Sequence, residues 1–318
     1  MREYENVGLR WENILREQIQ NVQDEYPEID VRSLFAPLIS MLNSNRIPSK
    51  IILSSGKVEA YGYILPAMGI RDRAISSVGF VKDSISNLPR GEKIIEWLEN
   101  ETIREGKLLI IDGLYNSSFL EEALQRHGFT RSNRVKMIGD IDRIVEKLKR
   151  VDTSGISSKL ELLHSAEVDP SAVSMAQLES YSTSPDRVLL IMEDGKNVTY
   201  SILLSGYYGK VMGSASLVAV NSSGILGSIT VTDGSDEISY RGIPLIVDFF
   251  TEVSRRHTGI GSYLLLRSVE SLKLLGHTQV QLWVNTSAEA MEFYVNCGFI
   301  ISGGENTTYW KDFRNSDK

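Results

Sequence analysis

A short loop in the C-terminal half of the chain carries the residues best suited to bind an anion. It reads Arg256-His257-Thr258-Gly259-Ile260-Gly261 and lies between an apolar stretch at 244–251 and a helical pattern at 262–275. A strand that turns through glycines into a helix leaves backbone N–H groups unpaired at the positive end of the helix dipole, where a phosphate group is favoured. Glycine also lets the backbone approach a ligand closely. The loop therefore predicts a pyrophosphate site, with ordinary turn chemistry as the alternative.

Two well-known nucleotide-binding loops do not fit this sequence. Leu264 occupies the third glycine position of the dinucleotide fingerprint, and no Gly-Lys-Ser/Thr follows a glycine at the Walker spacing. A nucleotide-dependent ligase or a dehydrogenase is thus disfavoured. Coenzyme A carries a pyrophosphate and needs neither loop, so it is the ligand that the motif favours.

Composition limits the other possibilities. The 318 residues suffice for two domains, and a net charge of −7 gives no general reason to expect nucleic acid or an anionic membrane as partner. A single cysteine, Cys297, excludes an internal disulfide, and the four histidines have no metal-ligand spacing, so we expect no metal. The N-terminus lacks the apolar core of a signal peptide, which makes a cytoplasmic location the expectation. The oligomeric state stays open.

The chain repeats itself at an offset of 170 residues. Residues 91–129 align without gaps on 261–299, with identical Gly, Gly, Ser, Glu, Gly and Phe. These identities fall where elements begin and end, which is informative because repeats define architecture. The first copy predicts helix 92–105, strand 107–114 and helix 117–126. The second predicts helix 262–275, strand 278–284 and helix 287–296.

Upstream of each repeat, the pattern predicts helices followed by meandering strands. Helical spacing occurs at 9–22, 31–42 and 170–181, and tight turns join short strands around Gly56 and Gly224. Hairpins combined with one parallel crossover predict an α+β (α/β layered) fold, in which helices flank a mixed central sheet. We place the domain boundary at 150/151, after a basic helix at 141–150.

The second half resembles the GNAT family of N-acetyltransferases. The resemblance combines the Arg-x-x-Gly-x-Gly loop with Asn285 at the end of a strand, then Ala288, Phe293-Tyr294 and Gly298-Phe299. It covers about 200–318, and the first half matches in outline, so the resemblance implies two tandem acyl-CoA N-acyltransferase folds.

The resemblance implies acetyl-CoA as acyl donor and an amine-bearing acceptor. Acetyl-CoA would lie between two parallel strands that splay apart, here 245–251 and 278–284. Backbone groups of Phe249, Phe250 and Thr251 would hold the pantetheine arm and the thioester carbonyl. The N–H groups of the loop would bind the pyrophosphate, and Arg256 would add charge, although the family more often uses the loop backbone. His257 would either contact a phosphate or be an exposed loop residue without a role. Asn285 would bond the cofactor, or else cap the turn that follows.

The resemblance also suggests the catalytic groups. Tyr294 would be the general acid that protonates the CoA thiolate; its alternative role is packing the last helix on the sheet. Asp248 and Glu252 are candidates for the general base, because strand alternation puts residues four apart on one face. A carboxylate inside an apolar strand is costly unless it is paired or exposed. Surface roles for both carboxylates stay open, and Cys297 is best explained by packing.

The first copy lacks the functional residues of the second. Ser86 aligns with Arg256, Pro89 with Gly259, and Leu124 with Tyr294. We therefore interpret 1–150 as a degenerate domain and 151–318 as the catalytic domain. The predicted function is acetyl transfer to a primary amine by direct attack in a ternary complex. The alternative is a CoA-binding or sensing module without turnover, and the sequence does not identify the acceptor.

Overall fold

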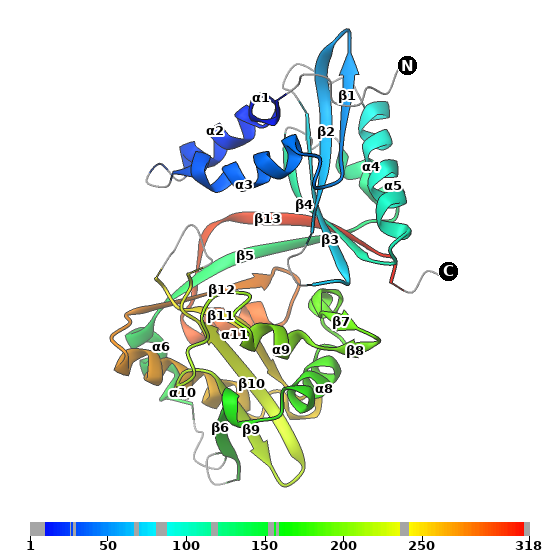
Figure 1. The fold of residues 1–318 in the computed structure, drawn as a ribbon. Helices are drawn as coiled ribbons and strands as arrows, with labels where there is room; N and C mark the ends of the chain where they lie inside the picture. Colours follow the sequence, from blue (N-terminus) through cyan, green and yellow to red (C-terminus); the bar gives the residue numbers. More distant parts are fainter. Residues whose placement is uncertain are drawn as a thin grey trace. The chain divides into compact units, whose positions relative to one another are not determined.

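The computed structural model describes residues 10–25, 27, 30–66, 70–80, 88–115, 120–151, 156, 159–235 and 242–314 (Figure 1). The chain divides into two compact units. Unit 1 comprises Met1–Ser132 with Thr307–Lys318, and unit 2 comprises Asn133–Asn306. Among the described residues, no helix is both long and apolar enough to cross a membrane.

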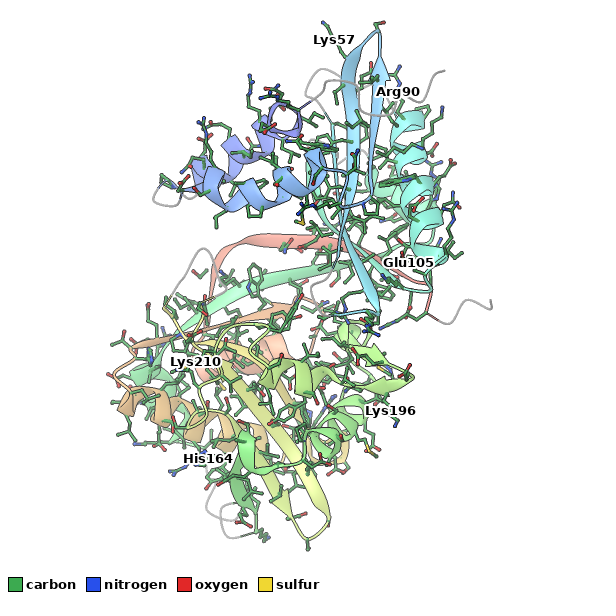
Figure 2. The ribbon with its side chains drawn as sticks, in the orientation of Figure 1. Lys57, Arg90, Glu105, His164, Lys196 and Lys210 are labelled. Carbon is green, nitrogen blue, oxygen red and sulfur yellow. The ribbon has the colours of Figure 1, made fainter. Side chains whose placement is uncertain are left out.

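Unit 1 has a mixed sheet with helices on both faces. Its strand order is β1-β2-β3-β4-β13, with β3 parallel to β4. The strands are β1 (Ser49–Ser54), β2 (Lys57–Pro66), β3 (Arg73–Phe80), β4 (Leu108–Tyr115) and the end of β13 (Ile300–Asp312). The helices are α1 (Trp11–Ile14), α2 (Arg16–Glu25), α3 (Val31–Asn43), α4 (Leu88–Ile103) and α5 (Glu121–Arg126). Helices α4 and α5 pack on one face and α1 and α3 on the other. Arg90 of α4, labelled in Figure 2, forms an ion pair with Glu59 of β2.

Unit 2 repeats this plan with the order β5-β12-β11-β10-β9-β6. Its strands are β5 (Thr130–Asp140), β6 (Glu161–His164), β9 (Leu217–Asn221), β10 (Gly224–Thr232), β11 (Leu245–Thr251) and β12 (Gln279–Asn285), with a separate hairpin of β7 (Met192–Glu193) and β8 (Lys196–Asn197). Its α-helices are α6 (Ile141–Leu148), α8 (Pro170–Ser180), α9 (Thr199–Leu204), α10 (Ile260–Leu274) and α11 (Ala290–Cys297). Its 3-10 helices are η2 (Ser165–Glu167), η3 (Pro185–Leu189) and η4 (Val253–Arg255). Apart from β7 and β8, the strands of both units belong to one 11-stranded mixed sheet, and its flanking helices confirm the predicted α+β class.

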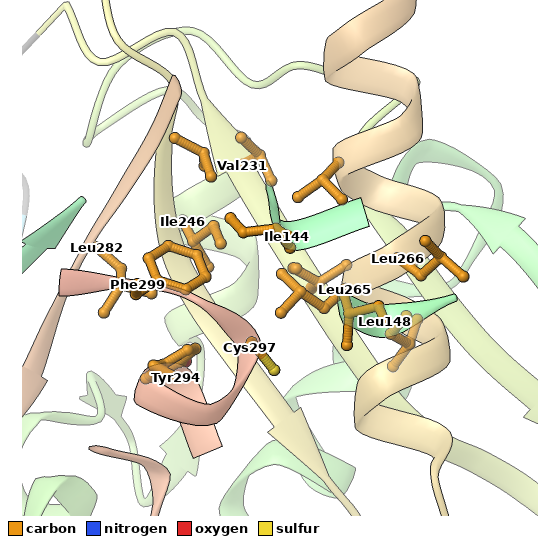
Figure 3. Packing of buried hydrophobic residues seen from close by; sticks show 14 of the residues in the cluster. Ile144, Leu148, Val231, Ile246, Leu265, Leu266, Leu282, Tyr294, Cys297 and Phe299 are labelled. Atoms are coloured by element: carbon orange, nitrogen blue, oxygen red, sulfur yellow. The ribbon is translucent and has the colours of Figure 1, made fainter. Parts of the chain in front are cut away.

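The two faces of the unit 2 sheet have separate apolar clusters. Helices α6, α10 and α11 pack on one face, where Ile144, Leu265 and Phe299 meet Ile246 and Leu282 (Figure 3). Helices α8 and α9 pack on the opposite face, through Val173 and Tyr200 against Val218 and Phe250. Alternation along a strand decides which face a side chain joins, and the extra residue Val247 interrupts it in β11, so that Ile246 and Phe250 lie on opposite faces.

Two strands, β5 and β13, pair with partners outside the half of the sequence in which they lie. β5 follows α5 of unit 1 but pairs with β12 over seven residue pairs in unit 2. β13 follows α11 of unit 2, and its last residues pair with β4, from Tyr309 opposite Ile111 to Asp312 opposite Leu108. The compact division therefore falls at 132/133 and assigns Thr307–Lys318 to unit 1, whereas the sequence placed the boundary at 150/151. Residues 152–155, which suggested that boundary, lie outside the described residues.

This strand exchange makes the C-terminal strand part of the unit 1 core. Tyr309 is fully buried in the cluster that contains Leu109 and Ile111. Tyr309→Ala is expected to lower the free energy of unfolding by about 3–5 kcal/mol in urea titration, as truncation of a buried aromatic does. Ile301→Ala, in the same strand but half exposed, should change it by less than about 0.5 kcal/mol. Equal effects of the two substitutions would contradict this assignment.

Candidate active site

Strands β11 and β12 of unit 2 run parallel and then part. They pair at only two positions, Leu245 with Gln281 and Ile246 with Leu282. Beyond Ile246, no described strand pairs with the edge of β11 that faces β12. The backbone N–H and C=O groups from Asp248 to Thr251 on that edge are thus available to a ligand, as buried backbone groups require partners.

The corresponding strands of unit 1 do not part. β3 and β4 pair at seven positions, from Arg73 opposite Leu108 to Gly79 opposite Tyr115. The side chain of Tyr61 also lies over Gly79, only 2.2 Å from the position that a Cβ would occupy there. The edge of β3 that would receive an extended ligand is therefore already used by β4. Ser86, the residue aligned with Arg256, lies outside the described residues.

The loop after β11 leads into α10 as the sequence predicts. Gly259 is the N-cap of α10 with φ of 92°, and a Cβ there would meet Ile156 at 2.6 Å, so the position requires glycine. His257 also has a positive φ, 59°, and its side chain is exposed. Ile260 is buried and anchors the start of the helix in the core. Among the described residues, none accepts a hydrogen bond from the N–H groups of 257–262.

Two polar side chains of the loop are already engaged. The Arg256 guanidinium donates to the carbonyl oxygen of Ser180 at 2.7 Å and lies 3.8 Å from the carboxylate of Glu289. The Thr258 hydroxyl donates to the carbonyl oxygen of Arg255. Backbone N–H groups, rather than these side chains, are thus the groups that the loop offers to an anion.

The three β11 residues predicted to hold the pantetheine arm point to both faces. Phe249 contacts the α10 and α11 side, where its ring lies 5.9 Å from that of Phe293, whereas Phe250 is buried on the α8 and α9 side. The Thr251 hydroxyl lies 3.4 Å from the position of a Cβ on Gly261. The end of β11 and the first turn of α10 are therefore in close contact.

Tyr294 lies in the apolar cluster of α11 (Figure 3). Its ring packs against Phe249, Phe293 and Phe299 at centroid distances of 6.3, 5.5 and 5.5 Å. Burial, followed by the negative charge of Asp248, raises the pKa of this phenol well above its usual range. The hydroxyl thus stays protonated at neutral pH, as a general acid must be before it reacts. Both roles that the sequence allowed, packing and proton donation, are compatible with this position.

Asp248 is buried on the opposite face of β11. A register shift between Thr230 and Val231 of β10 leaves Val247 as an extra residue, and Asp248 pairs with Thr230. Its Oδ1 accepts a hydrogen bond from the Tyr181 hydroxyl at 2.9 Å, while its buried Oδ2 accepts none from the described residues. Burial raises the pKa of Asp248 to about 6, although the nearby side chains of Gln177 and then Tyr181 oppose the shift. The carboxylate is therefore not a surface group.

Glu252 is separated from Asp248 because the strand ends at Thr251. Glu252 precedes the 3-10 turn η4, and its carboxylate accepts a hydrogen bond from the Ser254 hydroxyl at 2.6 Å. Glu252 therefore lies just beyond the end of the strand, and its role as a general base stays a prediction.

Asn285 uses its side chain in the turn after β12. Its Oδ1 accepts hydrogen bonds from the N–H and the hydroxyl of Ser287, at 3.0 and 2.8 Å, as in an Asx turn. Its Nδ2 donates to Asp186 at 3.4 Å. The structure thus supports the turn-capping role that the sequence left open, and a bond to a cofactor stays a prediction.

Cys297 is buried in the same cluster as Tyr294, and burial raises the pKa of its thiol to about 12. A neutral thiol is a poor nucleophile, so packing explains this residue. Within the described part of the chain, no group of three or more His, Cys, Asp or Glu side chains is arranged to hold a metal ion.

The sequence assigned no individual role to Tyr181 or Asp186, which lie beside the site within 171–186, a segment that the family resemblance places near the acceptor. Tyr181 follows α8 and contacts Asp248, and Asp186 lies in η3 and contacts Asn285. Both contacts join residues far apart in the sequence, and no motif marks either residue.

Comparison with known proteins rests on the structure alone. No model of a known protein family matches the sequence, and no curated protein matches it. A GCN5-related N-acetyltransferase from Sphaerobacter thermophilus aligns with 95% of this chain and 91% of its own, at a TM-score of 0.51 and 14% identity. The chain has the GNAT fold.

A second solved structure agrees with this fold. A functionally unknown conserved protein from Staphylococcus epidermidis aligns with 85% of this chain and 97% of its own, also at a TM-score of 0.51 and 14% identity. In the GNAT fold of this chain, the parted strands β11 and β12 and the loop before α10 occupy one end of the unit 2 sheet.

The raised pKa of Asp248 predicts a pH-dependent stability. In the folded state Asp248 keeps its proton up to about pH 6, whereas in the unfolded state it loses the proton near its ordinary pKa of 3.8. Between these two pH values the folded state binds more protons, so the free energy of unfolding falls as the pH rises. A difference of two pKa units corresponds to about 3 kcal/mol. We expect the difference in free energy of unfolding between Asp248→Asn and wild type to shift in favour of the variant by about this amount when the pH is raised from 4 to 7. Urea titrations of both proteins at each pH measure this difference. Parallel curves for the two proteins would contradict the burial of this charge.

Proposed function

We propose that this chain is an N-acetyltransferase that transfers the acetyl group of acetyl-CoA to a primary amine by direct attack in a ternary complex, with its site in unit 2. The observation that carries the proposal is the parting of β11 and β12 beside a helix start whose N–H groups have no described acceptor. An extended pantetheine arm can pair with an unpaired strand edge, and a helix N-terminus suits the diphosphate of the same molecule.

The residues of unit 2 have distinct roles in this proposal. The unpaired edge of β11 from Phe249 to Thr251 binds the pantetheine arm and donates to the thioester carbonyl, which is oxyanion-type stabilisation. The N–H groups of residues 257–262 bind the diphosphate. Tyr294 protonates the departing thiolate, and Asp248 receives the proton of the amine.

Unit 1 is a degenerate copy in this proposal. Its β3 and β4 stay paired over seven positions, so no equivalent edge is available to acetyl-CoA. Pro89 at the start of α4 also lacks the N–H group that Gly259 supplies in unit 2. We therefore assign cofactor binding to unit 2 alone.

Release of free CoA thiol from acetyl-CoA tests the proposal. The amines to be tried are spermidine, L-lysine, kanamycin and a hexapeptide with a free N-terminus, which represent different acceptor classes. Transfer to at least one amine, identified by the mass of the acetylated product, supports an acetyltransferase. Binding of acetyl-CoA without transfer to any of them supports a CoA-sensing module instead.

A further inference from the structure

The segment 180–186 connects the ends of the two strands that part. At one end, the carbonyl oxygen of Ser180 accepts a hydrogen bond from Arg256, which follows β11, at 2.7 Å. At the other end, Asp186 accepts one from Asn285, the last residue of β12, at 3.4 Å. Tyr181 lies between these two contacts. The segment therefore reaches both strand ends where the thioester of the proposed donor would lie.

Tyr181 and Asp248 form a hydrogen-bonded pair with unequal access to solvent. The Tyr181 hydroxyl donates to Oδ1 of Asp248 at 2.9 Å. Asp248 is 7% exposed and its Oδ2 is buried, whereas the Tyr181 residue as a whole is partly exposed. An amine that contacts the Tyr181 hydroxyl would therefore be joined to the buried carboxylate through a single hydrogen bond.

The surroundings keep Tyr181 in its hydroxyl form. Burial raises the pKa of Tyr181 well above its usual range, and the charge of Asp248 adds to this effect. Asp186 and Tyr294 also lie near enough to contribute. Tyr181 therefore does not ionise at neutral pH. It can transfer its hydroxyl proton to Asp248 only if its oxygen accepts another proton at the same time.

We infer that Tyr181 is a catalytic residue that relays the proton of the acceptor amine to Asp248, an inference that rests on the proposed acetyl transfer. As the neutral amine nitrogen bonds to the thioester carbon, its N–H proton moves to the Tyr181 oxygen, and the Tyr181 proton moves to Oδ1 of Asp248. The C–S bond then breaks, and the thiolate takes the proton of Tyr294. Asp248 later returns its proton through Tyr181 to solvent, from which Tyr294 is reprotonated, so no net proton is gained or lost.

A structural role for Tyr181 makes different predictions. Tyr181 follows the last residue of α8 and packs beside the cluster of Val173 and Tyr200. A phenylalanine preserves this packing and removes only the hydroxyl. Tyr200→Phe is the matched control, because Tyr200 is buried on the same face of the sheet and its hydroxyl has no hydrogen-bond partner in the described structure.

The test measures CoA release with the amines named above, together with acetyl-CoA affinity by calorimetry. Tyr181→Phe and Asp248→Asn should each lower kcat by about 100-fold or more, as loss of a general base does. Acetyl-CoA affinity should be unchanged, and the double variant should be no slower than either single variant. In the pH–rate profile of the residual Tyr181→Phe activity, the acidic limb should lie at higher pH than in wild type. The reason is that Asp248 loses a hydrogen bond that lowers its pKa. Tyr200→Phe should keep the wild-type rate.

Three results would overturn the relay while acetyl transfer stands. These are a Tyr181→Phe rate within about threefold of wild type, equal losses in Tyr181→Phe and Tyr200→Phe, or additive effects of Tyr181→Phe and Asp248→Asn, since independent sites add. A wild-type protein that transfers acetyl to none of these amines would instead contradict the proposed function, and the relay with it.

Discussion

Replacing Gly261 with aspartate is expected to abolish acetyl-CoA binding. Gly261 lies in the first turn of α10, and a Cβ there would lie 3.4 Å from the Thr251 hydroxyl and 3.7 Å from the Phe249 ring. A carboxylate at this position would lie in the first turn of α10, beside the N–H groups proposed to bind the diphosphate. Two unit charges at 4 Å repel by about 4 kcal/mol at an effective dielectric constant of about 20, which corresponds to roughly a 1000-fold loss of affinity.

The control for this substitution is Gly304→Asp, which makes the same chemical change in β13. A Cβ at Gly304 meets no atom within 4 Å, so the fold should tolerate it. Calorimetric titration of acetyl-CoA into both variants, with circular dichroism to confirm folding, checks the prediction. Normal affinity in a folded Gly261→Asp protein would show that the diphosphate does not lie at this loop.

Tyr294→Phe is expected to lower kcat by roughly 100-fold or more, the usual contribution of a general acid. The ring would stay packed against Phe249, Phe293 and Phe299, so the fold and the acetyl-CoA affinity should be retained. Steady-state CoA release, compared with the calorimetric dissociation constant, separates the loss of chemistry from the loss of binding.

Tyr309→Phe provides the comparison, because it removes the hydroxyl of a buried tyrosine in unit 1. Its rate should equal that of wild type. If Tyr294→Phe also keeps the wild-type rate, Tyr294 serves only to pack α11 on the sheet.

Local signals in the sequence predicted much of the fold. The apolar stretch 244–251 corresponds to β11 at Leu245–Thr251, and the helix expected at 262–275 is α10 at Ile260–Leu274. Glycines at the turns mark these ends, since Gly259 has a positive φ that other residues rarely adopt. The repeat likewise predicted α4 and β4 within a few residues.

Long-range pairing could not be predicted in this way. Local patterns do not specify the partners of β5 and β13, so the exchange that moves the unit boundary is visible only in the structure. The same limit applies to the site. Asp248 is an obvious candidate in an apolar strand, whereas its partner Tyr181 is 67 residues away and follows a different helix.

Local turn chemistry decides the position of two further residues. Glu252 lies beyond the strand because the chain turns into η4. The Asn285 side chain accepts a hydrogen bond from Ser287 two residues later, which is the turn-capping alternative that the sequence offered, because asparagine favours turns through such bonds.

Calorimetric titration of acetyl-CoA into the wild-type chain tests the central claim most directly. Among the described strands, β11 and β12 of unit 2 part whereas β3 and β4 of unit 1 stay paired, so we predict one binding site per chain. Two sites per chain would show that unit 1 also binds the donor despite its paired strands. No detectable binding would contradict the acetyltransferase proposal and leave the GNAT fold without its donor.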